Sequence, residues 1–227
     1  IVFGKYLNCG QTCVAPDYIL VHQSVKDKLI QELIKQIHKQ YSNTPLQSPI
    51  YGKIIHEGQY NRVLGLLDTS KVIYGGSSNK ETLQIEPTIM DHVTWNDKVM
   101  QEEIFGPILP VLTYENFDEM LNELKRKPHP LAFYLFTKNK NHISKVDNEM
   151  IFGGGCINDT IIHLASTELG FGGVGASGIG KYHGKDGFDA FSHTKSIVDK
   201  KCCIDLPMRY APYNNNLYNK LIRFFMK

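Results

Sequence analysis

The sequence predicts an α/β fold, a mainly parallel sheet with helices on both faces, followed by a C-terminal extended segment. Predicted strands alternate with predicted helices along most of the chain, which is the pattern of such a sheet. The chain has 227 residues and can bury a proper core, as one large domain or two small ones. Hydrophobic residues make up 42% and charged residues 21%, so disorder is not expected.

The first third of the chain contains an apolar run and two helical patterns. The β-branched run Val14 to Val21 predicts a buried strand. Ser24 to Asp27 has the spacing of a helix capping box, with Asp in place of Glu. Two series of apolar residues then follow with helical spacing: Val25, Leu29, Ile30, Leu33, Ile34 and Ile37, and later Tyr60, Val63, Leu64 and Leu67.

The remaining elements alternate in the same way. Extended segments are predicted at 72–74, 87–90, 108–114, 131–137 and up to 158, and a last one at 195–206. Helices are predicted at 97–103, after a cap at Asn116, and at 142–150. Residues 169–187 are rich in glycine and predict a loop.

Charge and cysteine usage exclude several classes of protein. The formal charge is +2, and 25 basic and 23 acidic residues are interspersed, so a nucleic-acid partner is not expected. Five cysteines without repeating spacing argue against a disulfide framework and for a cytoplasmic protein. The metal-binding motifs C-x-x-C and H-E-x-x-H are missing, so we expect no metal. The apolar tail 221–226 is short and flanked by lysines, so membrane association is not expected.

A glycine motif invites an interpretation that its context rejects. Gly173 to Gly178 spells G-x-G-x-x-G, and Asp199 lies 21 residues beyond it. A dinucleotide-binding fingerprint needs a hydrophobic strand before the motif and a helix opening on its last glycine. Thr167 to Gly170 precedes this motif and another glycine follows at 180, so a structural glycine loop is the better interpretation.

The segment Asn8-Cys9-Gly10-Gln11-Thr12-Cys13 predicts a presented thiol. Gly10 removes side-chain bulk near the cysteine, and the polar neighbours Asn8, Gln11 and Thr12 are expected to keep the loop hydrated and open. A buried, inert cysteine is the alternative on composition alone. Cys9 and Cys13 lie four residues apart, so we also consider a disulfide between them under oxidation.

Four segments together resemble the aldehyde dehydrogenase family, class 3 branch, over nearly all of the chain. They are Gly4 to Tyr18, Glu102-Glu103-Ile104-Phe105-Gly106-Pro107, Cys156-Ile157-Asn158-Asp159 and Leu169 to Gly180. By this resemblance Cys13 is the catalytic nucleophile. Glu103 binds the ribose hydroxyls on the nicotinamide side of NAD or NADP, and Phe105 packs near the nicotinamide. Asn158 and Phe171 belong to the substrate pocket; an ordinary core position fits Phe171 equally well, and a buried structural role for Asn158 is compatible with the pocket role.

The resemblance covers only the catalytic domain, 1–194, and a C-terminal oligomerisation segment and tail, 195–227. In the family, the Rossmann domain, the glutamate that activates water and the oxyanion asparagine all precede the cysteine segment. We therefore expect a fragment whose cofactor site is incomplete and which is inactive alone. The resemblance also implies an aldehyde substrate and a homodimer through 195–206. Another cysteine acyl-transfer enzyme and a non-catalytic interaction domain are the alternatives.

Overall fold

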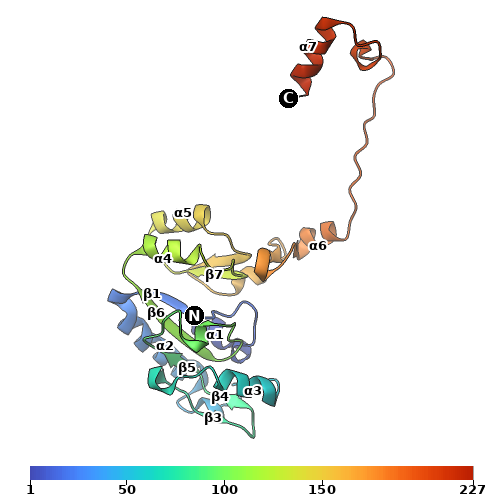
Figure 1. Ribbon diagram of the computed structural model, residues 1–227. Coiled ribbons are helices and arrows are strands. Elements are labelled where there is room, and N and C mark those ends of the chain that lie inside the picture. Colours follow the sequence, from blue (N-terminus) through green and yellow to red (C-terminus); the bar gives the residue numbers. More distant parts are fainter. Residues whose placement is uncertain (227) are drawn as a thin grey trace. The chain divides into compact units, whose positions relative to one another are not determined.

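The computed structural model describes residues 1–226 and divides into two compact units, residues 1–191 and residues 192–227 (Figure 1). The larger unit is built on a four-stranded sheet in the order β1-β6-β5-β2. These strands are β1 (Ile19–His22), β6 (Ile108–Tyr114), β5 (Thr88–Met90) and β2 (Val72–Tyr74). β6 runs parallel to both β1 and β5, whereas β2 at the edge is antiparallel to β5. The predicted mainly parallel sheet is thereby confirmed.

Helices cover both faces of this sheet. On one face, α1 (Val2–Tyr6) and α2 (Lys26–Tyr41) pack on the strands, and the other face packs on α3 (Glu57–Leu64) and the loops around it. Because successive side chains in a strand point to opposite faces, neighbouring residues enter different cores. The first core contains Val2, Tyr6, Ile19, Val21, Leu33, Ile37, Ile89, Leu109 and Val111. The second contains, among others, Tyr60, Val63, Met90, Ile104, Ile108 and Leu112.

A second parallel pair of strands lies in the same unit. β7 (Ala132–Leu135) pairs with β8 (Gly154–Ile157), and Tyr134 stands opposite Cys156 in the register. The helices α4 (Phe117–Leu124) and α5 (Lys140–Glu149) are joined by an ion pair, since Lys145 Nζ lies 2.6 Å from Asp118 Oδ1. The predicted cap of α4 is confirmed, because the Asn116 side chain accepts hydrogen bonds from two backbone amides of the first turn.

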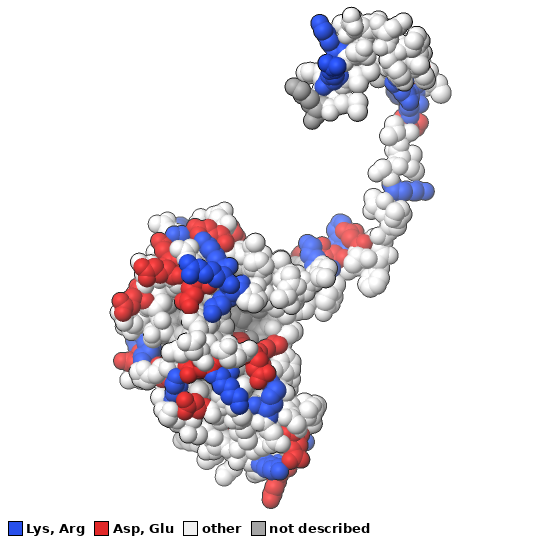
Figure 2. All heavy atoms as spheres, in the orientation of Figure 1, with Lys and Arg blue, Asp and Glu red and all other residues white. Residues whose placement is uncertain are grey.

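Short elements complete the chain. They are β3 (Ser78–Asn79), β4 (Gln84–Ile85), β9 (Phe171–Gly172), β10 (Lys181–Tyr182), α6 (Gly184–Ala190) and α7 (Asn216–Phe225). On the face of the larger unit in Figure 2, basic and acidic side chains are interspersed. Within residues 1–226, no helix combines the length and apolarity that crossing a bilayer requires.

Two predicted element starts are wrong. The strand predicted from Val14 begins only at Ile19, because the chain first turns, with the amide of Ala15 donating to Thr12 O at 2.9 Å. The capping box at Ser24 does not form. The Ser24 hydroxyl hydrogen-bonds His22 Nδ1 at 2.7 Å, and a short 3-10 turn precedes α2.

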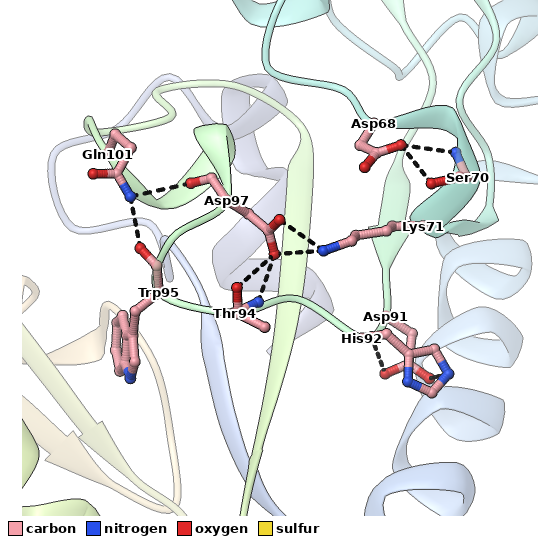
Figure 3. Close-up of polar contacts among 9 residues, drawn as sticks. All are labelled: Asp68, Ser70, Lys71, Asp91, His92, Thr94, Trp95, Asp97 and Gln101. Atoms are coloured by element: carbon pink, nitrogen blue, oxygen red, sulfur yellow. Dashed lines mark hydrogen bonds and ion pairs between the residues drawn. The ribbon is translucent and has the colours of Figure 1, made fainter.

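The helix predicted at 97–103 is only a 3-10 turn, Lys98–Met100, because side chains hold the surrounding loop in another shape. The Asp97 carboxylate accepts from Lys71 Nζ at 2.7 Å and from the Thr94 amide at 2.6 Å (Figure 3). Gln101 Nε2 donates to Trp95 O at 2.6 Å. These bonds tie the loop to the start of β2 and fix the chain just before Glu103.

The smaller unit has little regular structure. Among its described residues, 192–226, the structure assigns a 3-10 turn (Pro207–Arg209) and the helix α7, and no strand. The extended segment predicted at 195–206 therefore has no strand partner within the described chain. None of residues 192–226 is buried.

Candidate active site

The Cys13 thiol is exposed at the end of an unusual turn. Asn8, Cys9 and Gly10 are three consecutive residues with positive φ, at 50°, 55° and 74°. Left-handed backbone costs a non-glycine residue roughly 1–2 kcal/mol, so other contacts must hold the turn. The turn brings the chain out of the buried helix α1 and leaves Cys13 at the surface.

Several hydrogen bonds that stabilise this turn come from the Gln11 side chain. Its side-chain Nε2 donates to Asn8 O and to Lys53 O, each at 3.0 Å, and its Oε1 accepts from the Ile55 amide at 3.0 Å. A buried or paired amide that uses both its donor and its acceptor in this way fixes a loop. The loop is exposed at Asn8 and Cys13, and Gln11 has a further role that was not expected, because its amide pins the cysteine turn to residues 53–55.

Gly10 brings the cysteine turn against the segment 102–107. A Cβ atom at position 10 would lie 2.3 Å from Gly106 O, a distance that no side chain tolerates. Gly10 is therefore required twice, by its positive φ and by this approach of two backbones. The role expected for Gly10, close approach, is here an approach of protein to protein.

The segment carrying Glu103 and Phe105 is clamped through its backbone by α3. Arg62 donates to Glu103 O at 3.1 Å and also to Ile104 O, and Gln59 Nε2 donates to Phe105 O at 3.2 Å. Gln59 in turn accepts from Arg62 Nε at 2.8 Å. The clamp holds Phe105 at a φ of 47°, a strained value for an aromatic residue.

From the opposite side, Asp17 completes the clamp. Its Oδ1 accepts from the Ile104 amide at 3.1 Å. Sequence reasoning did not find Arg62, Gln59 or Asp17, because nothing in their local patterns distinguishes them from ordinary surface residues. Their role is visible only in the fold, where α3 meets a segment some forty residues further along the chain and Asp17 meets the same segment 87 residues away.

Glu103 and Phe105 line one open pocket of about 470 Å³. The other lining residues are Ile55, His56, Gln59, Arg62 and Glu102. The pocket thus offers a carboxylate and an aromatic ring next to the residues that Gln11 holds. A diol is recognised by a carboxylate acceptor, and a flat heterocycle packs on an aromatic ring, so these two residues fit the ribose and nicotinamide end of a dinucleotide.

A buried lysine lies beneath this site. Lys5, in α1, is 1% exposed, and burial lowers its pKa to about 8, against the opposing charges of Asp17 and Glu103. Burial likewise raises the pKa of Asp17 and of Glu103, while Lys5 and Arg62 act in the opposite direction. Buried Lys5, half-buried Asp17 and exposed Glu103 thus form one group of interacting charges.

The far side of the cysteine segment rests on β7 and the chain after β8. The Tyr134 hydroxyl donates to Val14 O at 2.7 Å, one residue beyond Cys13. A Cβ atom at Gly4 would lie 2.3 Å from Thr160 Oγ1, so α1 packs closely on the chain beyond Asn158. The nucleophile segment therefore lies between the segment around 103–106 and the segment around 158–161.

The two predicted substrate-pocket residues have well-defined surroundings. Asn158 has a φ of 61°, its Oδ1 accepts from the Thr137 amide at 2.8 Å, and its Nδ2 donates to Thr137 O at 3.0 Å. These bonds are the structural role that we considered as the alternative. Phe171 packs on the rings of Tyr182 and His183, with centroids 5.6 and 5.8 Å away.

Cys9 differs from Cys13 in its burial. Cys9 is buried in the second core, and burial raises its pKa to about 11. Both thiols are free in the structure. A disulfide between them stays a prediction, and it requires Cys9 to leave the core.

Comparison with known proteins gives one consistent result. The model of the family described as "Aldehyde dehydrogenase family" matches residues 1–197. The chain is 49% identical to the 4,4'-diaponeurosporen-aldehyde dehydrogenase of Staphylococcus aureus, over all of this chain and 50% of the relative. It is 45% identical to aldehyde dehydrogenase family 3 member A2 of Rattus norvegicus, over 88% of this chain and 41% of the relative.

Solved structures agree with these sequences. A structure described as the substrate-bound state of Staphylococcus aureus AldH superposes with a TM-score of 0.91 at 48% identity, covering 99% of this chain and 49% of that one. An NAD-dependent aldehyde dehydrogenase from Sinorhizobium meliloti superposes with a TM-score of 0.76 at 29% identity, covering 86% and 40%. The chain therefore spans about half the length of the curated relatives it matches.

Proposed function

Because this chain belongs to the aldehyde dehydrogenase family, we propose that it provides the nucleophile and the nicotinamide-side contacts of an NAD(P)-dependent aldehyde dehydrogenase. The reaction is the oxidation of an aldehyde to a carboxylic acid. One observation supports it above the others. The turn that exposes Cys13 packs, through Gly10 and Gly106, directly on the segment that carries Glu103 and Phe105.

Cys13 begins the chemistry in this proposal. Its thiolate attacks the aldehyde carbon, so that an S–C bond forms and the carbonyl oxygen becomes an oxyanion. Hydrogen-bond donors are needed at that oxygen, and the carbon must then lose hydride. The resulting thioester is hydrolysed by water, which releases the acid and restores the thiol.

Glu103 and Phe105 hold the nicotinamide end of the cofactor in this proposal. The cofactor, NAD or NADP, supplies the hydride acceptor when it is bound. The Glu103 carboxylate accepts from the ribose hydroxyls, and the Phe105 ring limits where the nicotinamide lies. Arg62 and Gln59 bind backbone oxygens of residues 103–105, and Arg62 also pairs with the Glu102 carboxylate at 3.3 Å, which leaves the side chains of Glu103 and Phe105 available in the pocket. Asn158 and Phe171 are proposed to border the aldehyde.

The chain on its own is proposed to be inactive. By resemblance, the adenine-binding domain, the water-activating glutamate and the oxyanion asparagine precede the cysteine segment in the family. The intact enzyme is proposed to dimerise through residues 195–206. A related protein of Canis lupus familiaris, 41% identical over 93% of this chain and 47% of its own length, carries the name "Aldehyde dehydrogenase, dimeric NADP-preferring".

A chimera tests this function. The part of the Staphylococcus aureus relative that precedes its matched half is fused to Ile1, and NADH or NADPH formation is measured with hexanal and with benzaldehyde. We expect turnover from the chimera and none from the isolated chain. A chimera that folds and binds NAD or NADP but oxidises no aldehyde contradicts the proposal.

The matched controls are cysteine variants of the same chimera. Cys13→Ser is expected to lower kcat by about 10⁴-fold or more, because the hydroxyl is a far weaker nucleophile than a thiolate. Cys156→Ser, Cys202→Ser and Cys203→Ser are expected to leave turnover within about twofold. A kcat of Cys13→Ser within tenfold of the parent would exclude Cys13 as the catalytic nucleophile.

A further inference from the structure

A cysteine–histidine pair lies outside the proposed active site. Cys156 is in β8, and its Sγ lies 3.4 Å from Nδ1 of His163, which belongs to the 3-10 turn Ile162–Leu164. A thiol and an imidazole within hydrogen-bond reach form the arrangement of a nucleophile and its base. Neither residue has a part in the function proposed above.

Regular structure holds this pair in place. Cys156 pairs with Tyr134 in the register of β8 and β7, so the two side chains lie on the same face of the strand pair. The His163 ring lies against Gly154, where a Cβ atom would be 3.1 Å from Cδ2. The ring of Tyr134 is 5.9 Å from that of His163. Cys156 is therefore placed by the strand pair, and contacts with Gly154 and Tyr134 place the His163 ring beside it.

The imidazole of His163 lies beside the thiol as a neutral ring. Burial lowers its pKa, so the ring is neutral near pH 7. In the tautomer that carries the ring hydrogen on Nε2, the thiol of Cys156 donates to Nδ1. That Nε2 is the buried side-chain nitrogen for which residues 1–226 supply no hydrogen-bond partner. An unsatisfied buried polar group calls for an explanation, and a chemical role is one of the recognised ones.

We propose that Cys156 is a modification site, a second reactive thiol that His163 activates and that hydroperoxides oxidise to a sulfenic acid. The partial exposure of Cys156 admits a small oxidant such as hydrogen peroxide. The paired tyrosine gives the site a connection to Cys13. Tyr134 hydrogen-bonds Val14 O, and the thiols of Cys156 and Cys13 are both within electrostatic range of its hydroxyl.

The oxidation balances with the peroxide as the only co-reactant. The thiol proton passes to Nδ1 of His163, and the sulfur attacks one peroxide oxygen. The S–O bond forms while the O–O bond breaks, and the departing oxygen takes the proton from His163. The sulfur loses two electrons to become the sulfenic acid, and the peroxide is reduced to water or an alcohol.

Per-cysteine trapping tests the proposal on the full chain. The protein is treated with limiting hydrogen peroxide in the presence of dimedone, which labels sulfenic acids, and each cysteine is quantified by mass spectrometry. We expect Cys156 to be labelled faster than Cys202 and Cys203, although both of those are exposed. Exposure alone predicts the opposite order, so labelling of Cys156 no faster than theirs overturns the proposal.

The variant His163→Gln isolates the activation. A thiol of ordinary pKa is about 3% ionised near pH 7, so complete activation is worth roughly 30-fold in rate. We expect the variant to slow labelling of Cys156 by roughly tenfold and to leave Cys202 and Cys203 unchanged. An unchanged rate at Cys156 overturns the proposal.

A second variant covers the case in which His163→Gln does not fold. The buried Cys9 reports folding, because it becomes labelled only when the core opens. His163→Ala opens space for a free imidazole, and we expect added imidazole to restore labelling of Cys156 at least threefold while Cys9 stays unlabelled. No restoration in the folded variant counts against His163 as the base. Labelling of Cys13 is measured separately, so a failure here is distinct from a failure of the proposed function.

Discussion

The two units of this chain treat apolar side chains in opposite ways. Residues 1–191 bury two hydrophobic cores on either side of one sheet, and strand residues such as Ile89 and Leu109 are completely buried. Residues 192–226 expose almost every large apolar side chain they carry. The exposed ones are Ile197, Val198, Ile204, Leu206, Tyr210, Tyr213, Leu217, Leu221, Phe224, Phe225 and Met226. The larger unit encloses its own cores, whereas the smaller one leaves its large apolar side chains exposed.

The largest expected effect tests this contrast with one substitution in both units. Ile89→Ala empties space at a position with 0% exposure, whereas Ile197 is 74% exposed. We expect Ile89→Ala to lower the free energy of unfolding by about 2–5 kcal/mol and Ile197→Ala to change it by less than about 0.5 kcal/mol. Urea denaturation of both variants measures the difference, and equal losses would show that the smaller unit also depends on burial.

A glycine pair tests how closely the cysteine turn is packed. Gly10→Ala places a methyl group 2.3 Å from Gly106 O at a φ of 74°, whereas Gly175, with a φ of 62°, has nothing within 4 Å of the same position. We expect Gly10→Ala to cost about 2–4 kcal/mol, from backbone strain and overpacking together, and Gly175→Ala only about 1 kcal/mol. Thermal melting and the alkylation rate of Cys13 are the measurements. An unchanged alkylation rate of Cys13 in Gly10→Ala would show that the position of this thiol does not depend on the contact with the 102–107 segment.

Lys5 offers a test by pH. Its pKa is lowered to about 8 in the folded chain, from 10.5. Between these values the unfolded chain holds the proton that the folded chain has released, so this residue makes stability rise with pH. From pH 8 to 9.5 the gain is about 2 kcal/mol. Lys5→Met has no titrating group at this position. The difference in unfolding free energy between parent and variant should therefore change by about 2 kcal/mol from pH 8 to 9.5. Parallel pH profiles of the two proteins would contradict this prediction.

The smallest effect on stability comes from the exposed strip of the smaller unit. The double variant Ile197→Asp with Val198→Asp should leave the unfolding free energy within about 0.5 kcal/mol, because both side chains are exposed. If residues 195–206 form a dimer, the same variant abolishes self-association in analytical ultracentrifugation. A parent chain that is already a strict monomer, with both side chains exposed, counts against that dimer.

Local patterns were enough for most elements of the larger unit. Strand β6 has the bounds that its apolar run predicts, and Asn116 caps α4 as its position indicates. The start of β1 was missed because an apolar run does not reveal a turn inside it. The cap at Ser24 was missed because His22, which satisfies the Ser24 hydroxyl, lies outside the pattern.

The site was predictable only in part, for a related reason. Cys13, Glu103 and Phe105 belong to motifs that can be recognised in the chain. The contacts that hold them come from Gln11, Arg62, Gln59 and Asp17, whose partners lie far away in sequence. Cys156 differs in that its partner His163 is only seven residues away, but the turn after β8 that brings the two together has no recognisable local pattern.

The contact between Gly10 and Gly106 also limits how this protein changes over generations. A side chain at Gly10 would meet the Gly106 carbonyl at 2.3 Å, and one at Gly106 would meet Val63 of α3 at 2.8 Å. A bulky replacement at Gly10 must therefore arrive together with a change around Gly106, and one at Gly106 with a smaller side chain at position 63. A designer who moves the Cys13 turn to another protein therefore has to move the segment 102–107 together with it.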